Sequence, residues 1–336
     1  MTIATTTTLQ APLEETLAFV SYHLRADIDH MYLFFDDPDD EALPILQDHA
    51  RLTCVPCDQA HWENLSVEDT SSVQRRQKAN ATHAFRRAKG KRIDWVAHVD
   101  SDEFLHFPNS ATEYFSTVSS EVEVVLFPVL EAVPQRFEYG RPFQEISLFK
   151  YFPRVRGDNS QYGMRPLGRA QYWIHSQLRR HKKQVATALG CEHSQIVGRY
   201  LPGHMVGKSA TRTAASVKEI SNHRPVPRSG ERLATSVATK AAVLHYDCRG
   251  FPQWKAKWAR RVDGEADFDI SRFAAHRRKQ LRLFRDAYSQ ENEHALRDLY
   301  KRWYFIPDRE RTILRGLGLV KEIDLPLSLF ETPRGT

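Results

Sequence analysis

The first half of the chain alternates between two hydrophobic patterns. Short runs of apolar and β-branched residues predict strands, and apolar residues spaced three and four positions apart predict helices. The predicted strands cover residues 2–8, 31–35, 52–55 and 95–100. The helices predicted between them cover residues 13–25, 41–50 and 71–89. This alternation predicts an α/β fold with a mostly parallel, Rossmann-like central sheet flanked by helices.

The second half of the chain shows a different pattern. A helix is predicted over residues 111–119 and a strong strand over residues 122–129. The periodicity then weakens, as in a long substrate-facing insertion. Beyond residue 250, basic amphipathic stretches predict helices. We therefore predict one α/β domain over residues 1–250 and a helical C-terminal extension over residues 251–336.

Three carboxylates follow the strand that ends at residue 100. Asp100, Asp102 and Glu103 interrupt the otherwise apolar segment Trp95–Leu105. A buried strand does not carry clustered carboxylates, because each would need a partner or would lose its charge. At the carboxyl end of a strand they can face the crevice in which open α/β sheets bind ligands. An Asp-x-Asp segment there offers oxygen ligands to Mg²⁺ or Mn²⁺, and such a cation holds a diphosphate. A polar turn after the strand is the alternative interpretation.

Composition excludes several classes of protein. The 336 residues are 41% hydrophobic and 27% charged, which is typical of a globular protein with a sizeable core. No apolar run approaches the roughly 18 residues of a membrane span, and the N-terminus has no basic region before an apolar one. We therefore expect a cytoplasmic protein. The glycine-rich phosphate loops of dinucleotide dehydrogenases and P-loop hydrolases are absent from the sequence.

A mild positive charge suggests an anionic partner. Lysine and arginine exceed aspartate and glutamate by six, which suits an anionic ligand or an anionic membrane face. The segment Phe251–Arg261 interleaves Trp254 and Trp258 with cations. One interpretation is a helix that docks its aromatic side on the main domain. The other is peripheral contact with the anionic inner face of a membrane, which would suit a lipid-linked acceptor.

Several motifs together resemble those of a known group of enzymes. Gln77-Lys-Ala-Asn80 precedes the Asp-Ser-Asp-Glu-Phe segment, and this pairing resembles the group formed by glycosyltransferase families 2 and 92. Tyr22-His23, the acidic turn at residues 36–40, Lys208-Ser209 and Leu244-His245-Tyr246, followed by Trp254 and Lys257, are similar to further motifs of that group. The resemblance covers roughly residues 2–262.

The resemblance implies a fold and a reaction. Such proteins have the GT-A fold and transfer a sugar from a nucleotide-sugar donor to a hydroxyl acceptor, usually with inversion and with Mn²⁺ or Mg²⁺. The donor half would cover about residues 1–130 and the acceptor half about residues 131–250. The acceptor would be a glycan, a polysaccharide or a lipid-linked molecule, and no nucleic acid is expected as a partner.

The resemblance also implies the metal ligands. Asp102 would bind the metal directly, Asp100 would contact the metal or the donor ribose, and His245 would complete the metal site. Without the resemblance, a lone histidine at the end of an apolar run is more often a buried packing residue, and the resemblance makes the two interpretations of His245 comparable. His98 is expected to pack in the core, and His223 is the alternative ligand.

Donor and acceptor contacts are expected from other positions. By the resemblance, Asp36 and Asp37 would lie near the base and ribose, and Gln77 would line the nucleotide pocket. By default the two aspartates would form a turn. Lys208 is expected against the diphosphate as a point charge, with a solvated surface lysine as the alternative. The acceptor hydroxyl needs a general base.

The candidates for this general base are two carboxylates, Glu103 and Glu131.

Two other classes of function stay open at this point. A metal-dependent phosphohydrolase would use the first aspartate of Asp-x-Asp as its nucleophile, although such enzymes place this motif on the first strand and Thr or Val where Phe104 stands. A non-catalytic binder of anionic polymers would account for the positive charge, although no nucleic-acid module motif is present in the sequence.

Overall fold

The computed structural model describes residues 1–151, 162–164, 177–178, 180–194, 207–229, 232–263 and 275–325. Parts of the predicted acceptor half and of the predicted C-terminal extension lie outside these ranges.

The largest of the three sheets in the described residues has eight strands in the order β3-β2-β1-β4-β10-β6-β13-β9. All neighbouring strands are parallel except β10, which is antiparallel to β4 and to β6. The prediction of a mostly parallel central sheet is confirmed. Its strands are β1 (Ile3–Leu9), β2 (His30–Phe35), β3 (Leu52–Pro56), β4 (Trp95–His98), β6 (Val124–Phe127), β9 (Tyr162–Met164), β10 (Lys208–Arg212) and β13 (Leu233–Val237).

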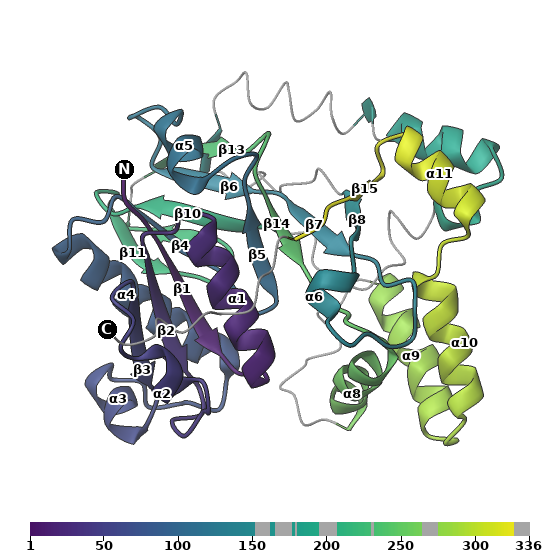
Figure 1. The fold of residues 1–336 in the computed structure, drawn as a ribbon, viewed down its shortest axis with the longest axis horizontal. Helices are drawn as coiled ribbons and strands as arrows, with labels where there is room; N and C mark the ends of the chain where they lie inside the picture. The colour runs from purple at the N-terminus through teal and green to yellow at the C-terminus, as the bar shows by residue number, and fades with distance from the viewer. Residues whose placement is uncertain are drawn as a thin grey trace, which may run out of the picture.

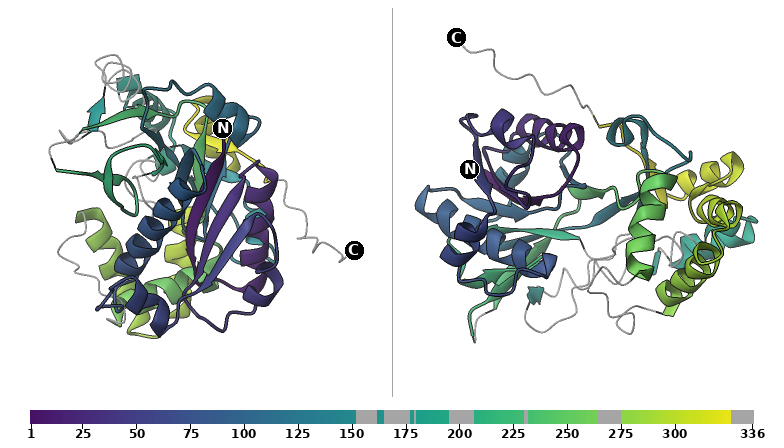
Figure 2. Two further views of the ribbon diagram at one scale, coloured as in Figure 1. Left: turned by 90° about the vertical axis from the view of Figure 1, so that its left-hand side faces the viewer. Right: turned by 90° about the horizontal axis from the view of Figure 1, so that it is seen from below.

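Helices cover both faces of the parallel strands (Figure 2). Helix α1 (Leu13–Arg25) buries Phe19 and Val20 in the core on one face. Helix α4 (Val73–Gly90) packs its alanine-rich side on the other face. The predicted helix over residues 41–50 is only the four-residue α2 (Leu43–Leu46). The shorter elements are α3 (Gln59–Asn64), α5 (Ala111–Ser116), α6 (Pro142–Glu145), the two-stranded sheet of β11 (Val217–Ile220) and β12 (Pro225–Pro227), and η1 (Glu192–Ser194).

The strand predicted over residues 122–129 is two strands in different sheets. Pro128 separates β6 from β7 (Val129–Ala132), because proline lacks the N–H that a continuous ladder requires. Strand β7 belongs to a five-stranded mixed sheet with the order β15-β8-β7-β14-β5. The other members are β5 (Glu103–His106), β8 (Leu148–Tyr151), β14 (Ala242–His245) and β15 (Val320–Glu322).

The edge strand β5 is held to α1 by the Tyr22-His23 pair. The Tyr22 hydroxyl donates to the Leu105 carbonyl at 3.1 Å, and His23 Nε2 accepts from the Leu105 N–H at 3.3 Å. The two side chains thus satisfy backbone groups that an edge strand would otherwise leave unpaired. This contact fixes the strand that directly follows the Asp-x-Asp segment.

Four helices form the C-terminal part of the described chain. The five-stranded sheet separates them from strands β1 to β4 (Figure 1). The helices are α8 (Phe251–Val262), α9 (Ala275–Tyr288), α10 (Glu293–Tyr304) and α11 (Asp308–Gly316). Trp254 and Trp258 are 1% and 2% exposed and pack with Phe284 of α9 and Trp303 of α10. The aromatic side of α8 is therefore buried within the protein, although these two contacts are with other C-terminal helices and not with the main domain that one interpretation named. Within the described ranges, no helix combines the length and the apolar character needed to cross a membrane.

Candidate active site

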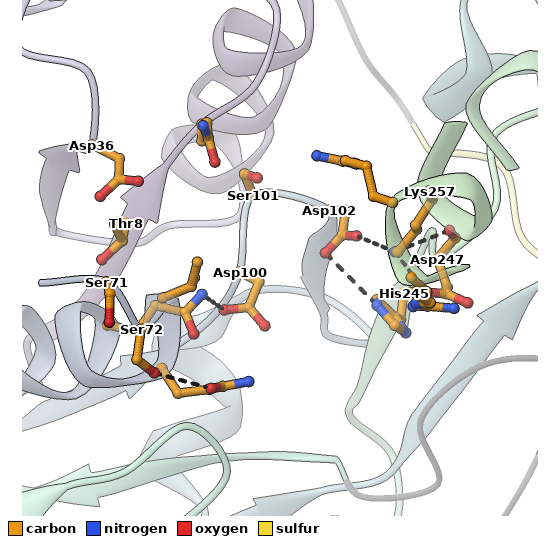
Figure 3. Close-up of a pocket in the computed structure, with 16 residues that line it drawn as sticks. Thr8, Asp36, Ser71, Ser72, Asp100, Ser101, Asp102, His245, Asp247 and Lys257 are labelled. Carbon is orange, nitrogen blue, oxygen red and sulfur yellow. Dashed lines mark hydrogen bonds and ion pairs between the residues drawn. The ribbon is translucent and has the colours of Figure 1, made fainter. Parts of the chain in front are cut away.

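A pocket of about 540 Å³ opens where the parallel strands end. Thr8 from the end of β1, Asp36 directly after β2 and Asp100 after β4 lie along it (Figure 3). Parallel strands present their carboxyl ends at one edge, which is why residues from distant parts of the sequence meet there. The remaining lining residues are Gln10, Ser71, Ser72, Val73, Gln74, Gln77, Ser101, Asp102, His245, Asp247, Lys257, Arg260 and Arg261.

Both carboxylate oxygens of Asp100 have partners within the protein. Gln77 Nε2 donates to Oδ1 at 3.0 Å, and the Lys208 ammonium lies 2.7 Å from Oδ2. Burial alone would raise the pKa of Asp100, but the Lys208 charge outweighs it and holds the pKa well below its usual range. Asn222 in turn donates to Gln77 Oε1 at 2.8 Å. Asp100 is therefore a fixed, ionised acceptor at the pocket wall.

The structure places Lys208 behind Asp100 and not in the pocket. Its side chain is 0% exposed, and its ammonium also lies 3.1 Å from Glu103 Oε2. Glu103 is 3% exposed and accepts a hydrogen bond from the Asp100 N–H at 2.9 Å. Burial raises the pKa of Glu103 to about 7, against the opposing charge of Lys208. Lys208 and Glu103 thus form the support of the Asp-x-Asp segment, and neither lines the pocket.

On the other side of Ser101, Asp102 faces His245 (Figure 3). Asp102 Oδ1 lies 3.7 Å from His245 Nε2, and Glu131 Oε1 lies 2.9 Å from His245 Nδ1. Burial opposes protonation of this imidazole, but Glu131 and Asp102 together raise the pKa of His245 to about 10. Glu131 is 2% exposed and lies behind the histidine, outside the pocket lining.

Strand pairing explains why these carboxylates meet one histidine. Strand β14 lies between β5 and β7. In that register His245 stands opposite Glu103 on β5 and opposite Glu131 on β7. The two candidate bases are therefore cross-strand neighbours of the predicted metal-binding histidine.

Only one of the two aspartates predicted near the base and ribose lines the pocket in the structure. Asp36 lines the pocket and is held by the Arg76 guanidinium through contacts of 2.7 and 2.6 Å. Asp37 is exposed, lies outside the pocket lining, and accepts from the Asp39 N–H at 3.0 Å as a turn former does.

His98 and His223, the other two histidines considered in the sequence analysis, also occupy different environments. His98 is 3% exposed in β4, with Nε2 4.0 Å from Asp100 Oδ1, and burial lowers its pKa to about 4. It is the core residue that was expected. His223 is half-buried, lies outside the pocket lining, and has its pKa lowered to about 4 by burial.

The lining residues that were not assigned a pocket role from the sequence include two at strand ends and three on α8. Gln10 directly follows β1 and Asp247 lies two residues after β14, so their position near strand ends was the available signal. Lys257, Arg260 and Arg261 lie on α8, and their three- and four-residue spacing was the signal for one shared helix side.

Asp102 and His245 are the residues whose chemistry fits a divalent cation. With Nδ1 bound to Glu131, the imidazole presents Nε2 toward Asp102, the carboxylate–histidine arrangement common behind metal ligands. The described residues hold no group of three or more His, Cys, Asp or Glu side chains arranged for a metal. Two protein ligands suit Mg²⁺ or Mn²⁺ that arrives with substrate phosphates and keeps several waters. Binding at this imidazole would release its proton.

Comparison with known proteins identifies the family of this chain. Residues 3–279 match the family model described as glycosyltransferase family 92. Two proteins of Arabidopsis thaliana named glycosyltransferase-like are 26% and 28% identical over 44% of this chain. The matched part covers 33% and 38% of those two proteins, so the chain spans little more than a third of their length. The family match covers most of the chain, and this chain therefore belongs to glycosyltransferase family 92.

Proposed function

We propose that this protein transfers a sugar from a nucleotide-sugar donor to a hydroxyl group of a glycan or lipid-linked acceptor. The observation that carries the proposal is the position of Asp102. Asp102 lies in the turn between β4 and β5, with Oδ1 3.7 Å from His245 Nε2, in a pocket that three cations of α8 also line. Family membership supports sugar transfer as the reaction.

A GT-A-type fold is part of the proposal. The parallel order β3-β2-β1-β4, followed by the antiparallel β10, supports it. In this arrangement the nucleotide would lie over the ends of β1 and β2, near Asp36, and the sugar would lie toward Asp102. Gln77 and Asp100 would form the floor between them.

In the proposed reaction the departing nucleoside diphosphate gains negative charge. When bound, Mn²⁺ or Mg²⁺ would stabilise that charge as a Lewis acid. Asp102 and His245 would hold the cation, and Glu131 would fix the orientation of the imidazole. Asp100, already bound to Lys208 and Gln77, would accept a hydrogen bond from the donor ribose.

We assign positioning roles to the two glutamates that the sequence offered as catalytic bases. Glu103 is bound to Lys208 and to the Asp100 backbone, and Glu131 is bound to His245. Neither lines the pocket, whereas a general base must come within hydrogen-bond reach of the acceptor hydroxyl.

The phosphohydrolase alternative requires a free nucleophilic aspartate at Asp100. Both of its oxygens are bound within the protein, and family membership also points to sugar transfer. We therefore do not propose hydrolysis of phosphomonoesters.

The experiment is the release of nucleoside diphosphate from a panel of nucleotide-sugars in the presence of Mn²⁺. We expect Asp102→Asn to lower the rate at saturating donor at least 100-fold while the protein stays folded. Asp39→Asn, in the exposed turn after β2, is the matched control and should retain the wild-type rate. Full turnover by Asp102→Asn would refute the assignment.

A further inference from the structure

Helix α8 presents two chemically different sides. Trp254 and Trp258 lie on the side buried against α9 and α10. Lys257, Arg260 and Arg261 lie along the pocket, at the i, i+3 and i+4 spacing that places them on one side of a helix. Because the aromatic side anchors the helix, the position of these cations is set by core packing and not by solvent.

The anionic side chains of the pocket already have partners. Asp36 is paired with Arg76, Asp100 with Lys208, and Asp247 with Lys257 at 2.6 Å. The Lys257 ammonium also lies 4.0 Å from Asp102 Oδ2, so it stands beside the Asp102–His245 pair.

Arg260 differs from these paired cations. It is exposed, and it makes no ion pair with any residue in the described ranges. Arg261 is half-buried, with its guanidinium 5.3 Å from the Trp258 ring centre. The α8 wall thus offers an anion one guanidinium with free donors and a neighbouring ammonium.

We propose that Arg260 and Lys257 form the subsite that binds the diphosphate of the donor, an inference that rests on the proposed function. A guanidinium binds phosphate oxygens with two parallel hydrogen bonds, and Lys257 adds a point charge next to Asp102. Lys208, the residue that the sequence suggested for this role, is fully buried and bound to two carboxylates. In this proposal the cations that bind the diphosphate therefore come from α8, the helix that follows β14.

The test is calorimetric titration with UDP, GDP, UMP and GMP in buffer containing Mn²⁺. We expect Arg260→Ala to weaken binding of the preferred nucleoside diphosphate about 10- to 100-fold, the range of a charge-assisted hydrogen bond. Binding of the matching monophosphate should change less than about threefold. Because Arg260 is exposed, this variant should fold normally.

Lys255→Ala is the matched control. Lys255 lies on α8 outside the pocket lining and pairs with Glu293 of α10, so its loss removes the same charge from the same helix. Diphosphate affinity should stay at the wild-type value in this variant. If Arg260→Ala binds the diphosphate as the wild type does, or weakens mono- and diphosphate equally, the inference is wrong. If the wild-type protein binds neither UDP nor GDP, the titration is repeated with the other nucleoside diphosphates. Binding of none of them would mean that the proposed function fails and the inference fails with it.

Discussion

The Nδ1 atom of His245 lies 2.9 Å from Oε1 of Glu131, and both side chains are almost completely buried. This pairing leaves Nε2 as the ring nitrogen that faces Asp102. The carboxylate therefore decides which nitrogen is available to a metal ion, and it does so from a position outside the pocket.

Replacing Glu131 should show whether this residue orients His245 or acts as the general base. We expect Glu131→Gln to weaken Mn²⁺ binding about 10- to 100-fold, because the imidazole loses the partner that orients it. Titration of free Mn²⁺ by electron paramagnetic resonance measures this affinity without any substrate. If Glu131 were instead the catalytic base, the variant would bind Mn²⁺ normally and lose only turnover.

The buried Lys208 should be important for stability. Lys208→Met would leave Asp100 and Glu103 without their shared cation, and breaking a buried ion pair costs about 3–5 kcal/mol. Urea denaturation measures the free energy of unfolding. Lys78→Met is the control, because Lys78 pairs with Glu219 at a site where both side chains are at least one-third exposed. It should change stability by less than about 1 kcal/mol. Equal changes in the free energy of unfolding for the two variants would show that Lys208 does not stabilise the Asp-x-Asp segment.

Stability should fall in mild acid in part because of His23. Burial lowers the pKa of His23 to about 4, below the ordinary value of about 6.5. The unfolded chain therefore binds a proton that the folded chain excludes, so the contribution is complete above about pH 6.5 and is lost as the pH falls toward 4. At pH 5 the loss is about 2 kcal/mol.

His23→Gln removes this titration, and its free energy of unfolding should decline less than that of the wild type between pH 7.5 and pH 5. Urea denaturation at the two pH values provides the comparison. Parallel declines in the two proteins would contradict the assignment of this pH dependence to His23.

The close approach of β10 to β6 depends on Gly207. A Cβ atom at this position would overlap the backbone carbonyl oxygen of Phe127. We expect Gly207→Ala to destabilise the protein by about 1–3 kcal/mol, because the strand that carries Lys208 must shift. Gly90→Ala is the control, since nothing lies within 4 Å of its added Cβ. Thermal denaturation of both variants tests this, and equal melting temperatures would argue against a tight approach.

The sequence predicted the parts of the fold that depend on local pattern. Strands β1 to β4 and helices α1 and α4 match their predicted ranges closely, because apolar periodicity within a short segment is sufficient to identify them. The position of Asp100 and Asp102 in the turn that follows β4 was indicated by the same pattern.

What the sequence could not provide depends on long-range pairing. The chain passes from one sheet to the other at Pro128, and only the three-dimensional arrangement shows that β7 and β5 flank β14. Without that register, nothing places Glu131 behind His245. Lys208 was misplaced for a similar reason, since β10 inserts between β4 and β6 from far along the chain and brings the lysine beneath Asp100.

We propose that Asp102 and His245 bind a divalent cation that in turn binds an activated sugar. Thermal-shift measurements with a panel of nucleotide-sugars, each with and without Mn²⁺, test it directly, because a ligand that binds only the folded state raises the melting temperature. We predict that at least one nucleotide-sugar stabilises the wild-type protein in a Mn²⁺-dependent way, and that Asp102→Asn abolishes the Mn²⁺-dependent part of the shift. A shift that is the same with and without Mn²⁺, or that is unchanged in Asp102→Asn, would contradict the claim.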